Sequence, residues 1–147
     1  DLSDPAVQAI SQQLDSVLVL SRSVAENGIH PAVDLLKTTC SLLTEQVVGE
    51  RHFQLASRVQ AIMQKYDSLK NIIAIVGENE LSPADRADYQ NAKTLIQFFS
   101  QDFAVAEHLN GKPGQYFTLA ETLQGVEDIL NGKAAAEQPA PKEAAKK

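Results

Sequence analysis

Three carboxylates close together in the sequence, Glu78, Glu80 and Asp85, are the side chains best spaced to do chemistry together. Neighbouring carboxylates can share a proton as an acid–base pair or bind a divalent cation. The same pattern is also typical of a solvated turn between two helices, where acidic residues favour the start of the second helix. That structural interpretation is much the more common one, and the residues alone favour it.

Other reactive groups give no stronger signal. His30, His52 and His108 lie far apart and form no metal-ligand spacing, and the lone Cys40 excludes an internal disulfide or a multi-cysteine zinc site. No histidine or basic residue is visibly paired with Cys40, which disfavours a nucleophile. The glycines of segment 110–114 have the wrong spacing for a phosphate-binding loop. We therefore expect no catalytic residue and no metal site in this chain.

Aromatic residues gather ahead of the last expected helix. Phe98, Phe99 and Phe103 could stack on a ligand, but such a cluster more often belongs to a hydrophobic core. Tyr116 and Phe117 directly precede a helix start, which is typical of a hydrophobic staple.

Composition narrows the class of protein. The net charge of −6 argues against a nucleic-acid partner, and 44% hydrophobic with 22% charged residues is typical of a globular domain. No apolar run reaches the 18 residues of a membrane span, so we expect no direct membrane insertion. The polar, acidic start is unlike a signal peptide, and its lack of Met led us to expect a fragment or processed product.

Three helices must position these groups. The first is predicted over 49–76, the second begins at Ser82-Pro83 with Asp85 in its first turn, and the third begins at Thr118 with a capping box. The apolar positions expected to face the core are Leu55, Val59, Ile62, Tyr66, Leu69, Ile73 and Val76, then Ala92, Leu95, Ile96 and Phe99, then Leu119, Leu123, Val126 and Leu130.

The amino-terminal part is ambiguous. Val7, Ile10 and Leu14 recur at helical spacing, but the apolar run 17–20 is equally consistent with a buried strand. Residues 29–48 are predicted to form an irregular connection, and the Ala/Lys/Pro-rich segment 133–147 to be disordered.

Several motifs, in unbroken order from residue 1 to about 133, carry a family resemblance. They are Asp1-Leu2-Ser3-Asp4-Pro5, Val19-Leu20-Ser21-Arg22, Gly28-Ile29-His30-Pro31-Ala32-Val33-Asp34, Val48-Gly49-Glu50, Ile72-Ile73-Ala74-Ile75-Val76-Gly77, Glu80-Leu81-Ser82, Phe99-Ser100-Gln101-Asp102-Phe103 and Ile129-Leu130-Asn131-Gly132-Lys133. Together they resemble the carboxy-terminal part of the catalytic β subunit of the rotary F-type ATP synthase.

The resemblance implies a mainly α fold, a bundle of about four to five helices with one short amino-terminal strand at about residues 15–20. It implies that residues 1–28 end a nucleotide-binding domain as a strand plus a helix, and that 29–132 form the helical carboxy-terminal domain, followed by the tail 133–147.

The resemblance also implies a role in a motor that couples ATP synthesis or hydrolysis to rotation and ion transport. Contact with the rotor shaft would fall to Glu78, Asn79, Glu80, Leu81, Ser82 and Asp85, and the adenine side to Phe103, Ala106 and Leu109. The phosphate loop and catalytic carboxylates of the family precede this segment, so the chain alone should be inactive, with Mg-ATP bound only by the full-length subunit. The implied partners are the α and γ subunits, peripheral on a bacterial plasma membrane or mitochondrial inner membrane.

Some positions depart from the family pattern. The acidic tip is diluted by Asn79, Pro83 and Ala84, and Leu109 stands where the family has an aromatic residue. These departures keep an alternative open, a standalone interaction or scaffold module derived from the β subunit and without catalytic activity. In such a module, a strand at 15–20 would have no sheet to join.

Overall fold

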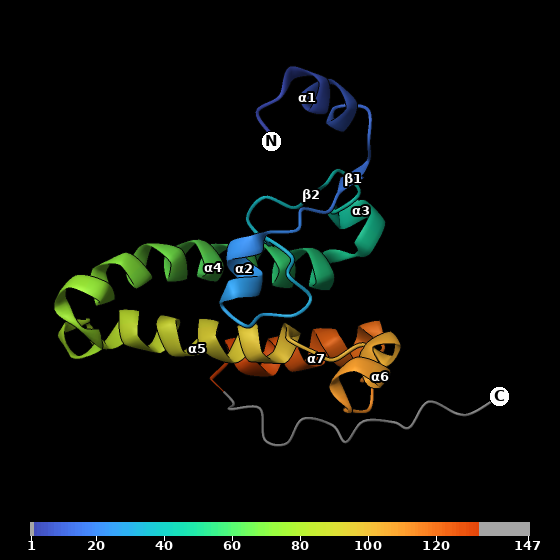
Figure 1. Ribbon diagram of the computed structural model, residues 1–147. Helices are drawn as coiled ribbons and strands as arrows, with labels where there is room; N and C mark the ends of the chain where they lie inside the picture. Colours follow the sequence, from blue (N-terminus) through green and yellow to red (C-terminus); the bar gives the residue numbers. More distant parts are fainter. Residues whose placement is uncertain (1, 133–147) are drawn as a thin grey trace.

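A long antiparallel helical hairpin dominates the computed structural model, which describes residues 2–132 (Figure 1). Its arms are α4 (Glu50–Val76) and α5 (Pro83–Phe99), joined by the short 3-10 helix η1 (Glu78–Glu80). A third helix, α7 (Leu119–Leu130), packs across both arms at the end away from the turn. The predicted mainly α fold is confirmed.

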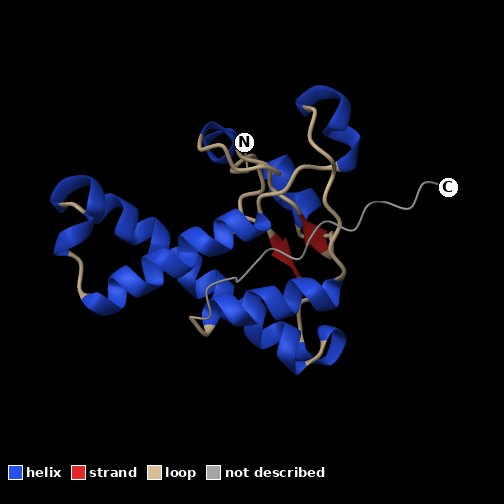
Figure 2. Cartoon of the chain, turned by 90° about the horizontal axis from the view of Figure 1, so that it is seen from below, coloured by secondary structure: helices blue, strands red, loops and turns tan. Residues whose placement is uncertain are grey.

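Shorter elements make up the rest of the described chain. Before the hairpin come α1 (Pro5–Ser11), β1 (Ser16–Val17), α2 (Arg22–Glu26), β2 (Thr39–Cys40) and α3 (Glu45–Val48), and between α5 and α7 lie the 3-10 helix η2 (Ala104–Ala106) and α6 (Glu107–Asn110). Figure 2 shows the hairpin extending away from these elements, with the two strands on the opposite side of the molecule.

The hairpin begins and ends where the sequence indicates. Gly49 and Gly77 flank α4 with φ of 85° and 88°, a conformation that other residues rarely adopt. Ser82 caps α5, since its Oγ accepts a hydrogen bond of 3.1 Å from the backbone N–H of Asp85. The predicted capping box of α7 is also present, built from Thr118 and Glu121.

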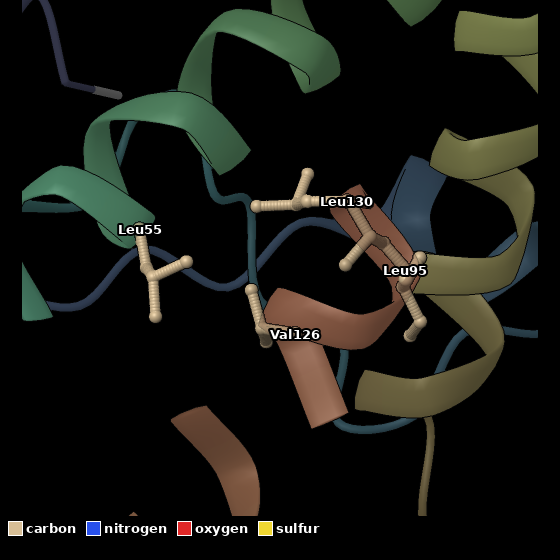
Figure 3. Packing of buried hydrophobic residues seen from close by; sticks show 5 residues of the cluster. Leu55, Leu95, Val126 and Leu130 are labelled. Atoms are coloured by element: carbon tan, nitrogen blue, oxygen red, sulfur yellow. The ribbon is translucent and has the colours of Figure 1, made fainter. Parts of the chain in front are cut away.

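The core lies at the base of the hairpin, where all three long helices meet. It consists of Leu55, Leu95, Val126, Ile129 and Leu130, with Val59, Ile62, Phe98, Phe99 and Leu123 packed around it (Figure 3). Two of the residues predicted to face the core are instead exposed. Leu119 is 61% exposed because it lies in the first turn of α7, and Val76 is 50% exposed at the far end of α4, beyond the core.

The amino-terminal segment differs most from expectation. The first helix ends at Ser11, which leaves Ile10 and Leu14 exposed instead of on a continuous helical face. The strand is present but short, and it is not alone: β1 pairs antiparallel with β2, Val17 opposite Thr39. The partner strand and α3 both fall within residues 29–48, which we expected to be irregular. The tail expected over 133–147 lies outside the described residues.

Candidate functional site

The six residues assigned to a rotor contact lie together at the turn of the hairpin, the end farthest from α7 (Figure 1). Gly77 stops α4, η1 carries Glu78, Asn79 and Glu80, and Ser82 starts α5. The sequence therefore placed this turn correctly. We refer to residues 77–85 as the tip.

Most polar groups of the tip are already bonded within the hairpin. A carboxylate oxygen of Glu78 accepts a hydrogen bond of 2.5 Å from the side chain of Gln90. The guanidinium of Arg86 donates to the backbone oxygen of Asn79 at 2.8 Å. Glu80 differs from Glu78, because its carboxylate makes no hydrogen bond or ion pair among the described residues. Glu80 is thus the acidic side chain of η1 that is free to meet a partner.

Leu81 and Asp85 face inward. Leu81 is only 8% exposed, which explains an apolar residue in an otherwise polar turn. The carboxylate of Asp85 lies 2.7 Å from the ammonium of Lys65 on α4 and accepts a second hydrogen bond from the Ser82 hydroxyl. These bonds, that of Lys65 first, lower the pKa of Asp85. Both residues therefore hold the tip together.

Lys65 joins the two arms of the hairpin. Its ammonium contacts Asp85 and, one turn further along α5, Asp88 at 2.5 Å. Hydrogen bonds to these two carboxylates raise the pKa of Lys65 above its ordinary value. Beside this contact the rings of Tyr66 and Tyr89 stack 5.2 Å apart, and burial is the main cause that raises the pKa of Tyr66. The sequence analysis missed this cluster.

An exposed apolar face lies on α4 directly before the tip. Ile72, Ile75 and Val76 occupy neighbouring positions on the last turns of α4 and are 47%, 85% and 50% exposed. The sequence analysis missed this face, because it assigned Val76 to the core stripe of α4. The available signal was the i, i+3, i+4 spacing of Ile72, Ile75 and Val76, of which only Val76 belongs to the stripe.

The carboxylates do not build a metal site in the part of the chain that the structure describes. Residues 2–132 contain no cluster of three or more His, Cys, Asp or Glu side chains placed to hold a metal ion. Glu78 and Asp85 are each bonded to a different side chain, Gln90 and Lys65. The arrangement fits the structural interpretation of the acidic turn.

The residues assigned to the adenine side lie on the connection between α5 and α7. Phe103 and Leu109 are 47% and 91% exposed, while Ala106 is partly buried in η2. The connection folds back on itself: the backbone N–H of Gly114 donates to the Glu107 carboxylate at 2.6 Å. A Cβ on Gly114 would lie 2.3 Å from the Ala104 backbone, so only glycine fits there.

The aromatic cluster divides between core and surface. Phe98 and Phe99 pack against the core with their rings edge to face, which confirms the core interpretation for these two. Phe103 is exposed, so it does not share that role. Phe117 lies 6.1 Å from Phe98, whereas Tyr116 is 70% exposed. Of the two residues that precede α7, Phe117 thus packs on α5 and Tyr116 does not.

A shallow groove lies between α4 and α7. Glu50, Arg51, Gln54, Arg58 and Glu127 provide its polar lining. The Arg51 guanidinium bonds the Glu127 carboxylate at 2.6 Å, and Gln54 bonds Glu50. Four of these groups thus bond one another in pairs, and Arg58 donates to the backbone oxygen of Leu130.

The family model for the C-terminal domain of V and A type ATP synthase matches residues 42–130, from the connection before α3 to the end of α7. A similar solved structure is that of "a unique ATP synthase subunit NeqB" from Nanoarcheaum equitans, with a TM-score of 0.73 and 22% identity over 90% of this chain. This chain covers 31% of that subunit, and at such identity the likeness is one of fold.

Within residues 2–132, no helix is both long and apolar enough to cross a bilayer. The family description speaks of V and A types, so the expected resemblance is upheld at the level of an ATP synthase carboxy-terminal domain. Since the match includes more than half of the sequence, the chain belongs to the family of the C-terminal domain of V and A type ATP synthases.

Proposed function

We propose that this chain is the carboxy-terminal portion of a nucleotide-binding subunit of a rotary ATP synthase, and that its tip contacts the central shaft. The observation that carries the proposal is the hairpin itself. Its base is fixed by the core. Its tip extends away from the other described elements and is connected only to α4 and α5 (Figures 1 and 2).

The dimensions and anchoring of the hairpin suit a lever. The 27 residues of α4 give a length of about 40 Å at a rise of about 1.5 Å per residue. Leu55 of α4 and Leu95 of α5 are fixed by α7 at one end, so a force at the tip would be passed to the base along two packed helices. The Glu80 carboxylate and the face of Ile72, Ile75 and Val76 would meet the partner.

The amino-terminal strand favours a part of a larger subunit over a standalone module. One edge of segment 15–21 is paired: Val19 accepts a hydrogen bond from Asp34, and Ser21 donates to Ala32. Yet Leu18 and Leu20, which alternate with these positions, are 65% and 69% exposed. An exposed apolar strand promotes aggregation unless another sheet or helix covers it. A nucleotide-binding domain would provide that cover.

Nucleotide chemistry would then belong to the larger subunit. The sequence contains no GxxxxGK[ST] phosphate loop, so we assign Mg-ATP and its hydrolysis to a preceding domain of the larger subunit. Phe103 and Leu109 are exposed and could meet an adenine held there, with Ala106 between them. Leu109 offers apolar contact in place of ring stacking.

The sequence resemblance supports an F-type β subunit, with α and γ as neighbours, whereas the family description supports a V- or A-type subunit. The F-type resemblance implies a ring of alternating subunits around a shaft, and we propose the same arrangement for either type. We propose that the chain is peripheral on an energy-coupling membrane, attached through that complex. The shaft subunit that it binds distinguishes the types.

A pull-down from the source cell tests this proposal. We expect the tagged chain to recover the shaft subunit and the alternating ring subunit, identified by mass spectrometry. A bait carrying Leu95→Asp is the matched control, because a buried unpaired charge should unfold the bundle and expose non-specific binding. Recovery of unrelated proteins without any shaft or ring subunit would favour the standalone interaction module.

A further inference from the structure

The two ends of the hairpin are held together by different kinds of contact. At the base, the core is apolar and includes residues of α4, α5 and α7. Toward the tip, the buried residues Leu69 and Leu81 are not part of that core cluster. Between these regions the arms are joined by a group of charged and tyrosine side chains, next to the buried Ala92 of α5.

This group, which we call the clasp, consists of Lys65 and Tyr66 on α4 and Asp85, Asp88 and Tyr89 on α5. One ammonium lies between two carboxylates, 2.7 Å from Asp85 and 2.5 Å from Asp88. The tyrosine rings stack alongside with an interplanar angle of 17°. The clasp residues therefore cross-link α4 to the first two turns of α5.

We propose that the clasp is a conformational latch: the charge of Lys65 keeps residues 66–84 docked, and its loss opens this part of the hairpin while the base stays folded. The proposal does not depend on the function proposed above. If that function holds, the latch sets the stiffness of the lever near its point of contact.

The reason lies in the charge balance. Asp85 and Asp88 are three residues apart on one helix, and like charges at that spacing repel each other. Lys65 is the cation that contacts both, so its removal loses two attractions and leaves the repulsion uncompensated. A single exposed ion pair contributes little to stability, but here the loss of one ammonium takes the three charged groups from a net charge of −1 to −2. The core residues at the base are all apolar and include no charged group.

Hydrogen–deuterium exchange of the pure chain tests the latch. We expect Lys65→Met to accelerate amide exchange in residues 66–84 by about 5- to 20-fold, without change in 119–130. Lys70→Met is the matched control on the same helix, since Lys70 makes no hydrogen bond or ion pair within the described chain. Adding Asp88→Asn to Lys65→Met should bring exchange part of the way back toward the unmodified rate, because the repulsion between the two carboxylates is then removed while Asp85 keeps its bond from Ser82.

Three results would overturn the latch. The first is unchanged exchange in residues 66–84 of Lys65→Met. The second is equal acceleration at the base and the tip, which would mean that the hairpin opens only as one unit with the core. The third is further acceleration when Asp88→Asn is added, because that would exclude carboxylate repulsion as the cause.

Discussion

Replacing Leu95 by alanine is expected to lower the free energy of unfolding by about 3 kcal/mol, the typical cost of emptying a fully enclosed leucine site. Leu95 has no exposed surface and belongs to the core shared by α4, α5 and α7, where it lies beside Leu130 (Figure 3). Because these helices hold the site from several sides, they cannot collapse fully into the cavity. Urea unfolding followed by circular dichroism measures the loss.

Leu119→Ala is the control for this prediction. Leu119 lies on α7 but is 61% exposed, so its truncation should change stability by no more than about 0.5 kcal/mol. Equal losses in the free energy of unfolding for Leu95→Ala and Leu119→Ala would contradict the placement of Leu95 in the core.

Gly125→Ala is expected to destabilise the bundle, although alanine favours a helix over glycine by about 1 kcal/mol. A Cβ at residue 125 of α7 would lie 2.5 Å from the ring of Phe98 on α5, too close for any real contact. That ring is itself held by Phe99 and Phe117, so it cannot simply turn away. Overpacking of this kind costs about 1–3 kcal/mol, which exceeds the gain in helix propensity.

A variant with Phe98→Leu separates overpacking against the ring from the gain in helix propensity. With Phe98→Leu the ring is gone, and Gly125→Ala should then cost much less or become stabilising. A thermal shift series on the four variants measures this coupling. An increase in melting temperature of Gly125→Ala in the otherwise unmodified chain would contradict the close approach of α5 and α7.

Local signals in the sequence were sufficient for the hairpin. Caps and glycines act within one helical turn, so Ser82, Thr118 and Gly77 could be assigned to helix ends without knowledge of the fold. The stripe that begins at Leu55 was likewise visible as a 3.6-residue period. The position of the acidic turn followed from these boundaries.

Contacts between distant segments could not be predicted in this way. The strand β1 has only two residues and is defined by its partner at Thr39–Cys40, a pairing that no local pattern specifies. The same limit applies to Lys65, whose two partners are 20 and 23 residues away on another helix. For this reason the sequence indicated an acidic tip, whereas the structure shows Asp85 bound inward and Glu80 free.

The central claim, contact between the tip and the shaft, is tested most directly by photocrosslinking in the assembled complex. A benzophenone would be attached to Glu80→Cys in a Cys40→Ser background, because Cys40 is exposed and would compete for the reagent. Ala120→Cys, at the base of the bundle, provides the control position. We predict a crosslink to the shaft subunit from residue 80 and none from residue 120. No shaft crosslink from residue 80, or equal yields from both positions, would contradict the account.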